Sequence, residues 1–315
     1  GIVGALAAQN ITPFLIEGLR QLEYRGYDSA GLALLDGATL SRVRAVGRVA
    51  ELTAACAGHA ADLGIAHTRW ATHGAVTQDN AHPHLSSGGG LEVCVVHNGI
   101  IENHHALRQD LQAAGYTFAS QTDTEVIAHL LHQSRLVSND LTSALRAIAG
   151  RLQGAYALAA ISTLDPGTLV ATRLGAPLLI GQGQTPQEAY LASDASALLQ
   201  VTQSLIYLED GDLVTLQRQA LGGLVTRSIE DRTGATAARP VVQSDLSLED
   251  VSLGPYAHYM QKEMAEQPGA VAATLEMVTG ATSLSPALFG ADAEDAFAQT
   301  KQVLILACGT SLHAG

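Results

Sequence analysis

Apolar side chains in the first part of this chain change from strand-like to helix-like spacing within about 20 residues. Residues 2 to 7 form a short apolar run, which predicts a strand. A helix is predicted next, because apolar positions recur at helical spacing behind Thr12-Pro13, where proline favours a first helical turn. These positions are Ile11, Phe14, Leu15, Leu19 and Leu22.

The rest of the first half continues this mixture of elements. The pattern predicts strands at 31–35, 40–46, 64–68 and 91–96, and helices at 48–57, 102–114 and about 140–152. Thr122 and Glu125 have the spacing of a capping box, and they precede an apolar run at helical spacing, so a helix is predicted there too. The segment between 68 and 91 is predicted to be a loop, because His, Gly and Asn crowd it.

Beyond residue 154 the pattern indicates antiparallel strands, and then a second domain. Residues 154–217 contain short β-rich runs separated by Gly, Pro and Asp, so the first domain is α+β. The polar stretch 228–248 indicates the end of a last hairpin and a linker. We therefore predict a domain over 1–240, a linker over 241–250 and the start of another domain over 251–315. In that last part, 256–280 is expected to be a helix, and QVLILACGTSLHAG a buried strand that enters a glycine turn.

Composition narrows the class of protein. The chain is 47% hydrophobic, but no apolar run reaches the roughly 18 residues of a membrane span, so no membrane partner is expected. A formal net charge of -13 argues against a nucleic-acid partner. The three cysteines are odd in number and widely spaced, which favours a reducing compartment, and the first residues lack a signal-peptide layout. We expect a cytoplasmic protein.

Histidines gather between residues 65 and 105. This segment lacks the HExxH and CxxC spacings of metal sites, so no metal is predicted. Single histidines there are expected to cap loops or to have their hydrogen bonds satisfied in the core. The histidines are His67, His73, His82, His84, His97, His104 and His105.

Three further features are ambiguous on their own. Arg69 and Trp70 stand at the end of a predicted strand. The Arg69 guanidinium could bind a carboxylate through two hydrogen bonds, or it could stack on Trp70 in a purely structural role. Asn98-Gly99 follows another strand, and the local sequence favours a hairpin turn over an oxyanion-binding pair. Asp123 begins a helix, where an acid is favoured by the helix dipole but would also bind an ammonium group.

Taken together, the motifs resemble one family over essentially the whole chain. Their order is similar to that in the glutamine:fructose-6-phosphate aminotransferases (isomerising), also called glucosamine-6-phosphate synthases. The motifs are GIVG at 1–4, LEYRGYDSAGLA at 22–33, HTRWATHG at 67–74, NAHPH at 80–84, VVHNGIIEN at 95–103, TDTEVIAHL at 122–130 and HYMQKEMAEQP at 258–268.

The resemblance implies both a fold and an activity. It implies a four-layer αββα N-terminal nucleophile (Ntn) hydrolase domain, followed by the truncated start of a Rossmann-like sugar isomerase (SIS) domain. The implied reaction hydrolyses L-glutamine to glutamate and passes the ammonia to fructose 6-phosphate, which gives glucosamine 6-phosphate for amino-sugar synthesis. No cofactor is implied. The full-length protein is expected to be a homodimer.

The resemblance also assigns roles to residues. It implies that Arg69 binds the α-carboxylate of glutamine and Asp123 the ammonium, while Asn98 and Gly99 form the oxyanion hole. Trp70, Thr72, His73 and His82 are implied to complete the glutamine pocket. Residues Arg25, Gly26 and Asp28 are expected to support it. Within the segment Cys308-Gly309-Thr310-Ser311, Thr310 and Ser311 are implied to begin a sugar-phosphate site, which suits a glycine turn ahead of a helix.

The family's nucleophile is a cysteine at the mature N-terminus, and its own α-amine serves as the base. That cysteine is expected directly before Gly1, so this chain is expected to bind glutamine at most and to be inactive. Cys56, on a predicted helix, and Cys94, inside an apolar strand, are poor substitutes because buried thiols are usually inert.

Two other functions also fit parts of this sequence. One is another glutaminase of the superfamily, in the phosphoribosyl-pyrophosphate or asparagine-forming branches, against which HYMQKE and ILACGTS argue. The other is a non-catalytic homologue that senses glutamine or a sugar phosphate, which would keep a pocket without a nucleophile.

Overall fold

The computed structural model describes residues 1–71, 74–220, 223–246, 253–276, 293–307 and 312–313. Its backbone contacts divide the chain into two units, Gly1–Ser252 and Leu253–Gly315, each described here by itself. Among the helices described, none combines the length and the apolar composition needed to cross a membrane.

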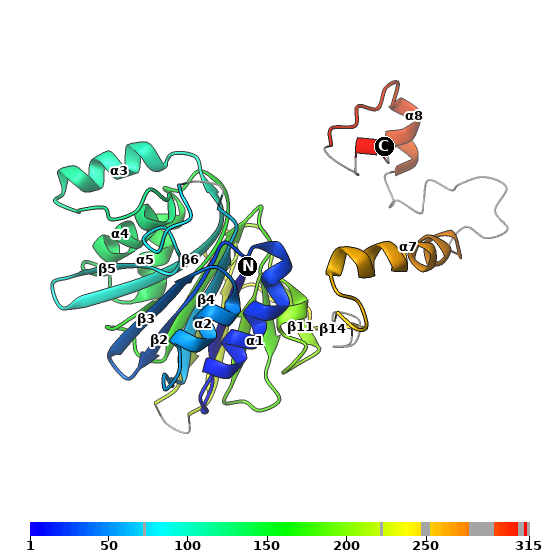
Figure 1. Ribbon diagram of the computed structural model, residues 1–315. Helices are drawn as coiled ribbons and strands as arrows, with labels where there is room; N and C mark the ends of the chain where they lie inside the picture. The colour runs from blue at the N-terminus through cyan, green and yellow to red at the C-terminus, as the bar shows by residue number, and fades with distance from the viewer. Residues whose placement is uncertain (72–73, 221–222, 247–252, 277–292, 308–311, 314–315) are drawn as a thin grey trace. The chain divides into compact units, whose positions relative to one another are not determined.

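The first unit contains two antiparallel sheets (Figure 1). The strands of one are β1 (Ile2–Leu6), β2 (Ser29–Asp36), β3 (Thr39–Val46), β4 (Leu63–Arg69), β9 (Leu179–Gln182), β10 (Ala189–Ala192), β11 (Ser204–Tyr207) and β14 (Val242–Gln243), in the order β14-β11-β9-β10-β1-β4-β2-β3. The strands of the other are β5 (His84–Gly88), β6 (Leu91–Ile101), β7 (Gly154–Ser162), β8 (Thr168–Leu174), β12 (Leu213–Arg218) and β13 (Val225–Glu230), in the order β13-β12-β8-β7-β6-β5.

Helices cover the outer face of each sheet, so the unit has four layers (Figure 1). Helices α1 (Thr12–Leu22) and α2 (Val49–Ala55) pack on the eight-stranded sheet, together with the short helices η1 (Glu23–Arg25) and η2 (Ala195–Ala197). Helices α4 (Thr124–Arg135) and α5 (Leu141–Ala149) pack on the six-stranded sheet, and α3 (His104–Ala113) packs beside α4. This arrangement is the predicted α+β, αββα architecture.

The alternation of side chains along the strands builds three apolar layers. In β1, Ile2 faces the other sheet and Val3 faces α1. In β6, Val96 faces the layer between the sheets, whereas Val95 packs against α4. Successive strand residues point to opposite faces, so the parity of a residue decides which layer it enters. Each fully buried aliphatic side chain contributes about 1.5–3 kcal/mol to the folded state.

Two predictions about the six-stranded sheet are wrong. The hairpin turn favoured at Asn98-Gly99 is absent, because β6 continues to Ile101 and pairs Asn98 with Ala157 and Gly99 with Tyr156 of β7. The segment before β6, predicted to be a loop, contains β5, which pairs with β6 from His84 to Gly88. Pairing with a distant strand outweighs the local turn signal in the first case.

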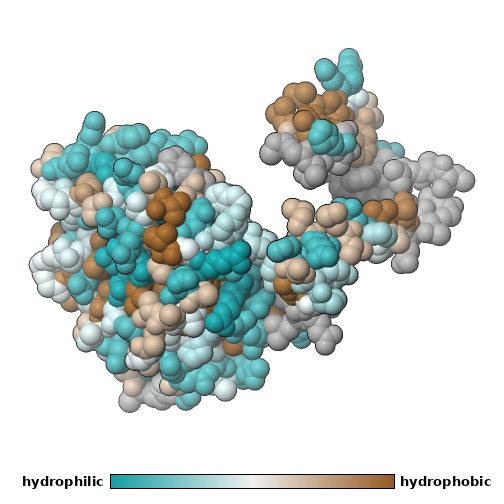
Figure 2. Space-filling view, viewed as in Figure 1, coloured by the Kyte–Doolittle hydropathy of each residue, from teal (hydrophilic) through white to brown (hydrophobic). Residues whose placement is uncertain are grey.

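The second unit contains α7 (Tyr259–Glu276) and α8 (Ala293–Gln299). Helix α7 falls inside the helix predicted at 256–280, whose last four residues lie outside the described ones. The buried strand predicted near the end is wrong for the described residues 302–307, which have no regular structure. Val303 is 75% exposed and Leu306 is 85% exposed, and Figure 2 shows hydrophobic surface in this unit. A lone strand cannot satisfy its backbone groups, and the described part of this unit offers no strand to pair with.

Candidate functional site

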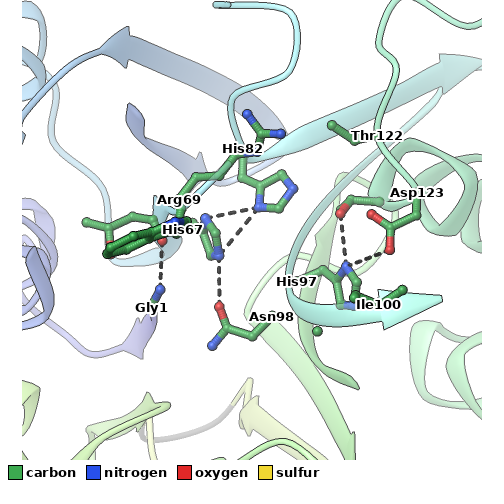
Figure 3. Close-up of a pocket in the computed structure, with 13 residues that line it drawn as sticks. Gly1, His67, Arg69, His82, His97, Asn98, Ile100, Thr122 and Asp123 are labelled. Atoms are coloured by element: carbon green, nitrogen blue, oxygen red, sulfur yellow. Dashed lines mark hydrogen bonds and ion pairs between the residues drawn. The ribbon is translucent and has the colours of Figure 1, made fainter. Parts of the chain in front are cut away.

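A cavity of about 300 Å³ opens where β1 begins, β4 and β6 end, and α4 starts (Figure 3). It is lined by residues from both sheets, and they include six of the predicted site residues. The lining residues are Gly1, His67, Thr68, Arg69, Trp70, His82, His97, Asn98, Gly99, Ile100, Thr122, Asp123 and Thr124. The other predicted residues, Thr72, His73, Thr310 and Ser311, lie outside the described part of the chain.

Gly1 reaches this cavity because it extends the ladder between β1 and β4. The register pairs Ile2 with His67. The α-nitrogen of Gly1 donates to the carbonyl oxygen of Thr68 at 2.7 Å, and the Thr68 N–H donates to the Gly1 carbonyl oxygen at 3.0 Å. In the same register, a residue joined to the Gly1 nitrogen would lie opposite Arg69. Its side chain would share the face of Ile2, between the sheets.

Arg69 is the last residue of β4, and only 5% of its surface is exposed. Burial lowers the pKa of its guanidinium, and the carboxylates of Asp28 and Asp123 act in the opposite direction. A guanidinium stays charged in proteins and presents a planar fork of donors. Arg69 is therefore a buried cation at a cavity wall, an arrangement that suits a small carboxylate ligand.

The stretch around Gly26 supports the backbone that carries Arg69. A Cβ added at Gly26 would lie 2.7 Å from the backbone nitrogen of Trp70, so this close approach requires glycine. The N–H of Asp28 donates to the carbonyl oxygen of Arg69 at 3.1 Å. The Asp28 carboxylate accepts from the N–H of Ala71 at 2.8 Å. Gly26 and Asp28 thus make the predicted kind of supporting contact, whereas the Arg25 side chain lies outside the described atoms.

Trp70 lies at the edge of the cavity and is largely exposed to solvent. Its exposed fraction is 57%, and its ring centroid lies 5.7 Å from that of Tyr27, which is also half exposed. The guanidinium of Arg48 lies 6.0 Å from the Tyr27 ring centroid. Trp70 therefore contributes apolar surface at the rim of the cavity.

Asn98 and Gly99 are consecutive residues of β6, and both line the cavity. Asn98 shares the face of Val96, between the sheets, and its Oδ1 lies 2.9 Å from Nε2 of His67 on the other sheet. Gly99 has φ +112°, and a Cβ there would lie 2.0 Å from the carbonyl oxygen of Ala155. Only glycine fits that backbone. An amide side chain and a glycine backbone therefore border the same space.

Asp123 occupies the N-cap position of α4 without a capping hydrogen bond from its side chain, and 6% of its surface is exposed. Its Oδ2 accepts a hydrogen bond from the N–H of Ile101 at 2.9 Å and lies 4.0 Å from Nδ1 of His97. The helix dipole favours an acidic group at this position. The cavity therefore has a carboxylate on one wall and a guanidinium on another, as a zwitterionic ligand requires.

His97 is a lining residue to which the sequence analysis gave no individual role. Burial lowers the pKa of its imidazole, although the Asp123 carboxylate opposes the shift. Its Nδ1 lies 2.9 Å from Oγ1 of Thr124, in α4. Thr124 lies 27 residues from His97 in the sequence, and no local motif predicts this contact.

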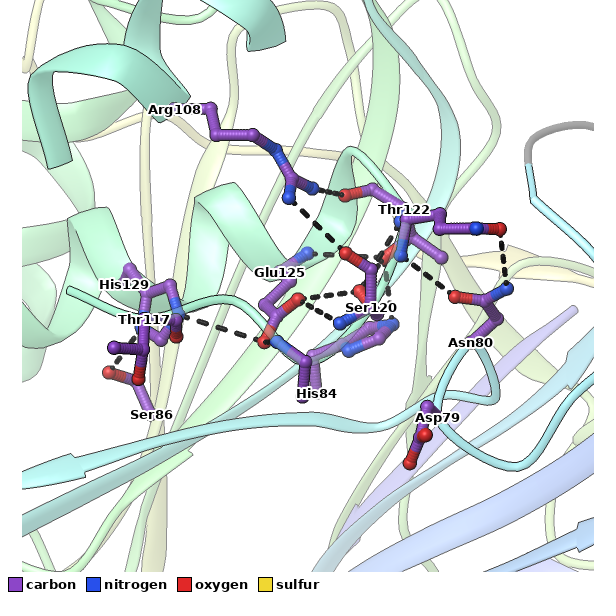
Figure 4. A network of polar contacts seen from close by, with 12 residues as sticks. Asp79, Asn80, His84, Ser86, Arg108, Thr117, Ser120, Thr122, Glu125 and His129 are labelled. Atoms are coloured by element: carbon purple, nitrogen blue, oxygen red, sulfur yellow. Dashed lines mark hydrogen bonds and ion pairs between the residues drawn. The ribbon is translucent and has the colours of Figure 1, made fainter. Parts of the chain in front are cut away.

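A buried polar network holds the segment before Asp123 (Figure 4). The carboxylate of Glu125 accepts from the N–H of Ala119 at 2.9 Å, from the N–H of Ser120 at 2.7 Å and from the Ser120 hydroxyl at 2.6 Å. Burial raises the pKa of Glu125, but hydrogen bonds from His129, Ser120 and Ala119 outweigh it and lower the pKa to about 2. The Glu125 carboxylate is thus ionised, and its hydrogen bonds hold the segment before Asp123 in place. The capping-box prediction is only partly right, because the Glu125 side chain does not return to Thr122.

The same network reaches the neighbouring loops. Nε2 of His84 lies 3.0 Å from Oγ1 of Thr122, and burial lowers the pKa of His84 to about 3. Arg108 donates to the carbonyl oxygen of Thr122 at 2.8 Å. Asn80 accepts from the N–H of Gln121 at 2.9 Å, so the segment before β5 is joined to the segment before α4. These contacts fix the position of the residue that follows, Asp123.

The described cysteines lie outside the cavity lining. Cys56 follows α2, and burial raises the pKa of its thiol to about 11. Cys94 lies within β6, and burial raises its pKa to about 12. Both thiols are buried and protonated at neutral pH, so neither has nucleophilic character. Over the described residues, moreover, no group of three His, Cys, Asp or Glu side chains could hold a metal ion.

Comparison with known proteins gives a family context for this cavity. The family model of the glutamine amidotransferase domain matches residues 67–200. A glutamine–fructose-6-phosphate aminotransferase (isomerizing) from Xylella fastidiosa is 49% identical over 317 residues, which cover 100% of this chain and 50% of that protein. Its counterpart from Pseudomonas putida is 52% identical over 318 residues, with the same coverage of each chain. The chain thus spans about half the length of the curated relatives it matches.

Solved structures share the fold of the first unit. A glutamine phosphoribosylpyrophosphate amidotransferase from B. subtilis superposes with a TM-score of 0.62 at 24% identity, over 72% of this chain and 48% of that one. An allosteric regulatory enzyme of purine biosynthesis gives a TM-score of 0.61 at 25% identity, with the same coverage. These neighbours confirm the predicted Ntn-hydrolase type of amidotransferase fold.

Proposed function

Because this chain belongs to the glutamine–fructose-6-phosphate aminotransferase family, we propose that its first unit binds L-glutamine in the cavity of Figure 3 and, with a cysteine joined to the Gly1 nitrogen, hydrolyses its side-chain amide. One observation carries the proposal: a buried guanidinium, a buried carboxylate and an Asn-Gly pair border a single space of about 300 Å³ at the start of β1. A free amino acid has the charges that match the first two of these groups.

In this proposal each cavity wall binds one part of glutamine. Arg69 binds the α-carboxylate through two parallel hydrogen bonds. Asp123 binds the α-ammonium, and Trp70 covers the aliphatic part of the ligand. Nδ2 of Asn98 and the N–H of Gly99 donate to the amide oxygen and stabilise the negative charge that develops on it. His82 lines the same space, and Thr72 and His73 stay predicted members of the pocket outside the described residues.

The proposed nucleophile is a cysteine joined to the nitrogen of Gly1. The β1–β4 register would place its side chain between the sheets, on the face that carries Asn98. Its thiol proton passes to its α-amine while the sulfur attacks the amide carbon. The α-ammonium returns that proton to the leaving nitrogen as the tetrahedral intermediate collapses to a thioester and ammonia. Water then hydrolyses the thioester to glutamate and regenerates the thiol. No metal or organic cofactor takes part.

The acceptor of the ammonia is proposed from the names of the relatives. Their printed name specifies fructose 6-phosphate, so we infer that the full-length protein makes glucosamine 6-phosphate. We propose the cytoplasm as its compartment, because the three cysteines are odd in number and widely spaced. We propose that residues 1–240 are the glutaminase domain, 241–250 the linker and 251–315 the start of the sugar isomerase domain. A sugar-phosphate site at Thr310 and Ser311, outside the described residues, and a homodimer through the isomerase domain complete this proposal.

Glutamate release tests the glutaminase function directly. The chain is produced with a mature N-terminal cysteine directly before Gly1, and a protein with serine at that position serves as the matched control. We expect glutamate release from the cysteine protein and none above background from the serine protein. A folded cysteine protein that releases no glutamate at saturating glutamine would overturn the proposal.

A binding measurement separates the proposed enzyme from the non-catalytic sensor. Calorimetry of the serine protein with L-glutamine is expected to give saturable binding. Saturable binding in both proteins, with no glutamate from the cysteine protein, would instead indicate a glutamine-sensing homologue.

A further inference from the structure

Two buried imidazoles and the partly buried Asn98 are connected in series across the two sheets (Figure 3). Nδ1 of His82 lies 3.0 Å from Nδ1 of His67, and Nε2 of His67 lies 2.9 Å from Oδ1 of Asn98. His67 comes from β4 and Asn98 from β6, so the series joins one sheet to the other. The exposed fractions of His67 and His82 are 3% and 6%. The proposed reaction uses Asn98 but gives neither imidazole a chemical step.

Both imidazoles are neutral, and each therefore has one donor and one acceptor nitrogen. Burial lowers the pKa of His67 well below its usual range. Burial likewise lowers the pKa of His82, followed by the effect of His67. Neither ring then has a second N–H at neutral pH.

A neutral His67 ring allows a single role for its Nε2 in this geometry. Oδ1 of Asn98 only accepts, so Nε2 of His67 carries the hydrogen and donates to it. His82 packs on the same ring, with its Nδ1 3.0 Å from Nδ1 and 3.4 Å from Nε2 of His67 and with the two ring centroids 4.3 Å apart. His82 therefore holds the His67 ring, and His67 donates to Asn98.

We propose that His67 and His82 are positioning residues that hold the Asn98 carboxamide with Oδ1 against His67, which leaves Nδ2 to donate into the cavity. The inference rests on the proposed function, in which that Nδ2 stabilises the negative charge on the amide oxygen. With the opposite orientation of the amide, an oxygen would face the developing charge and repel it. The two imidazoles thus act on the reaction through Asn98.

The backbone on either side of His82 is itself held firmly. A Cβ added at Gly31 of β2 would lie 2.2 Å from the carbonyl oxygen of His82, so the strand abuts this residue directly. Arg44 donates to the carbonyl oxygen of Ala81 at 3.1 Å, and Arg42 donates to that of Pro83 at 3.4 Å. A site is precise when such supporting groups fix the residues that face the ligand. These contacts fix His82, which lies at one end of the series.

The tautomers provide the first test, and they require no catalysis. Histidine labelled with ¹⁵N in the ring is incorporated into the 315-residue chain, and long-range ¹H–¹⁵N spectra are recorded at neutral pH. His67→Gln and His82→Asn identify the two rings. We expect His67 with its hydrogen on Nε2. A His67 ring with its hydrogen on Nδ1, or a doubly protonated ring, would overturn the inference.

Kinetics of glutamate release provide the second test, in the chain with a cysteine directly before Gly1. A glutamine side chain has an N–H donor near the place of Nε2, so His67→Gln keeps the contact to Asn98, whereas His67→Ala removes it. We expect His67→Ala to lower kcat by about 10- to 100-fold, with KM within a few-fold of the parent, because one oxyanion donor is no longer oriented. His67→Gln is expected to recover most of the loss.

A matched control separates orientation of Asn98 from general stability. His132 is equally buried, bonds to Tyr116 and to the carbonyl oxygen of Gly88, and does not line the cavity. His132→Gln is therefore expected to leave kcat unchanged. If the parent releases no glutamate, the proposed function fails. If the parent is active and His67→Ala matches its kcat, or changes KM alone, the positioning inference fails while the function stands.

Discussion

The carboxylate of Asp123 accepts a hydrogen bond from the backbone N–H of Ile101, at 2.9 Å. The two residues belong to different elements, since Ile101 ends β6 and Asp123 occupies the N-cap position of α4. Because Asn98 and Gly99 lie on the same strand, this bond fixes the carboxylate relative to the Asn-Gly pair. Asp123 thus has one oxygen engaged in the fold, and its charge faces the cavity.

Asp123→Asn should separate these two roles. The amide oxygen of asparagine still accepts from Ile101, so the melting temperature is expected to stay close to that of the parent. The lost charge should weaken glutamine binding by about 1.5–3 kcal/mol, the usual contribution of a hydrogen bond to a charged group. Calorimetry measures the binding. Asp123→Ala, which removes both roles, should also lower the melting temperature, and unchanged glutamine affinity in Asp123→Asn would contradict the assignment.

Arg69→Lys should show whether the geometry of the fork matters. A lysine keeps the charge but loses the bidentate contact, so we expect glutamine binding to weaken by about 2 kcal/mol, or roughly 30-fold in Kd. Arg135 pairs with Asp165 at 2.7 Å and does not line the cavity, which makes Arg135→Lys a suitable control with unchanged affinity. An Arg69→Lys protein that binds glutamine like the parent would argue against a carboxylate at this wall.

Glu125 is expected to be important for stability. Glu125→Ala would leave the N–H groups of Ala119 and Ser120 and the Ser120 hydroxyl without their acceptor, and each buried orphan donor costs about 1–3 kcal/mol. We expect the free energy of unfolding to fall by about 3–5 kcal/mol, after partial relaxation, as measured by urea denaturation. Glu125→Gln, which keeps an acceptor oxygen, should lose less. An Ala variant as stable as the parent would show that the network is dispensable.

Acid should destabilise the fold in a predictable pH window. Burial lowers the pKa of His84 to about 3 and the pKa values of His67 and His82 well below the ordinary 6.5. As the pH falls below 6.5, these three imidazoles therefore bind protons in the unfolded chain but not in the folded one. Stability from these groups is fully present above pH 6.5 and is lost as the pH falls below it, with a slope of up to about 4 kcal/mol per pH unit for three protons.

Urea denaturation at several pH values between 5 and 7.5 measures that slope. His67→Gln should reduce it by about one proton, because it removes one of the groups that titrate on unfolding. A free energy of unfolding that is constant over this range would contradict the burial of neutral imidazoles.

Local patterns predicted most of the strands and helices of the first unit, because alternation and helical spacing report which side chains are buried. They failed where a distant partner decides the structure. Asn98-Gly99 is a dipeptide typical of hairpin turns, but pairing with Ala157 and Tyr156 keeps it in β6. The HLSSG segment of β5 lacks an apolar alternation, and only its neighbour β6 makes it a strand.

The candidate site was still less accessible to local reasoning. The cavity brings together Arg69, Asn98 and Asp123, which no spacing rule connects. Their grouping was predicted from the family resemblance, and their individual roles remain predictions. The pairing of His67 with Asn98 was not anticipated at all, because it depends on the parity of residues in two strands of different sheets.

The hydrogen bonds between Gly1 and Thr68 have a practical consequence for making this protein. They hold the first nitrogen in the ladder, so anything attached to it is directed into the ligand cavity. A group left on the α-nitrogen of the proposed cysteine would therefore compete with glutamine for space and would remove the free amine that acts as the base. The mass of the intact protein should be checked before any ligand titration.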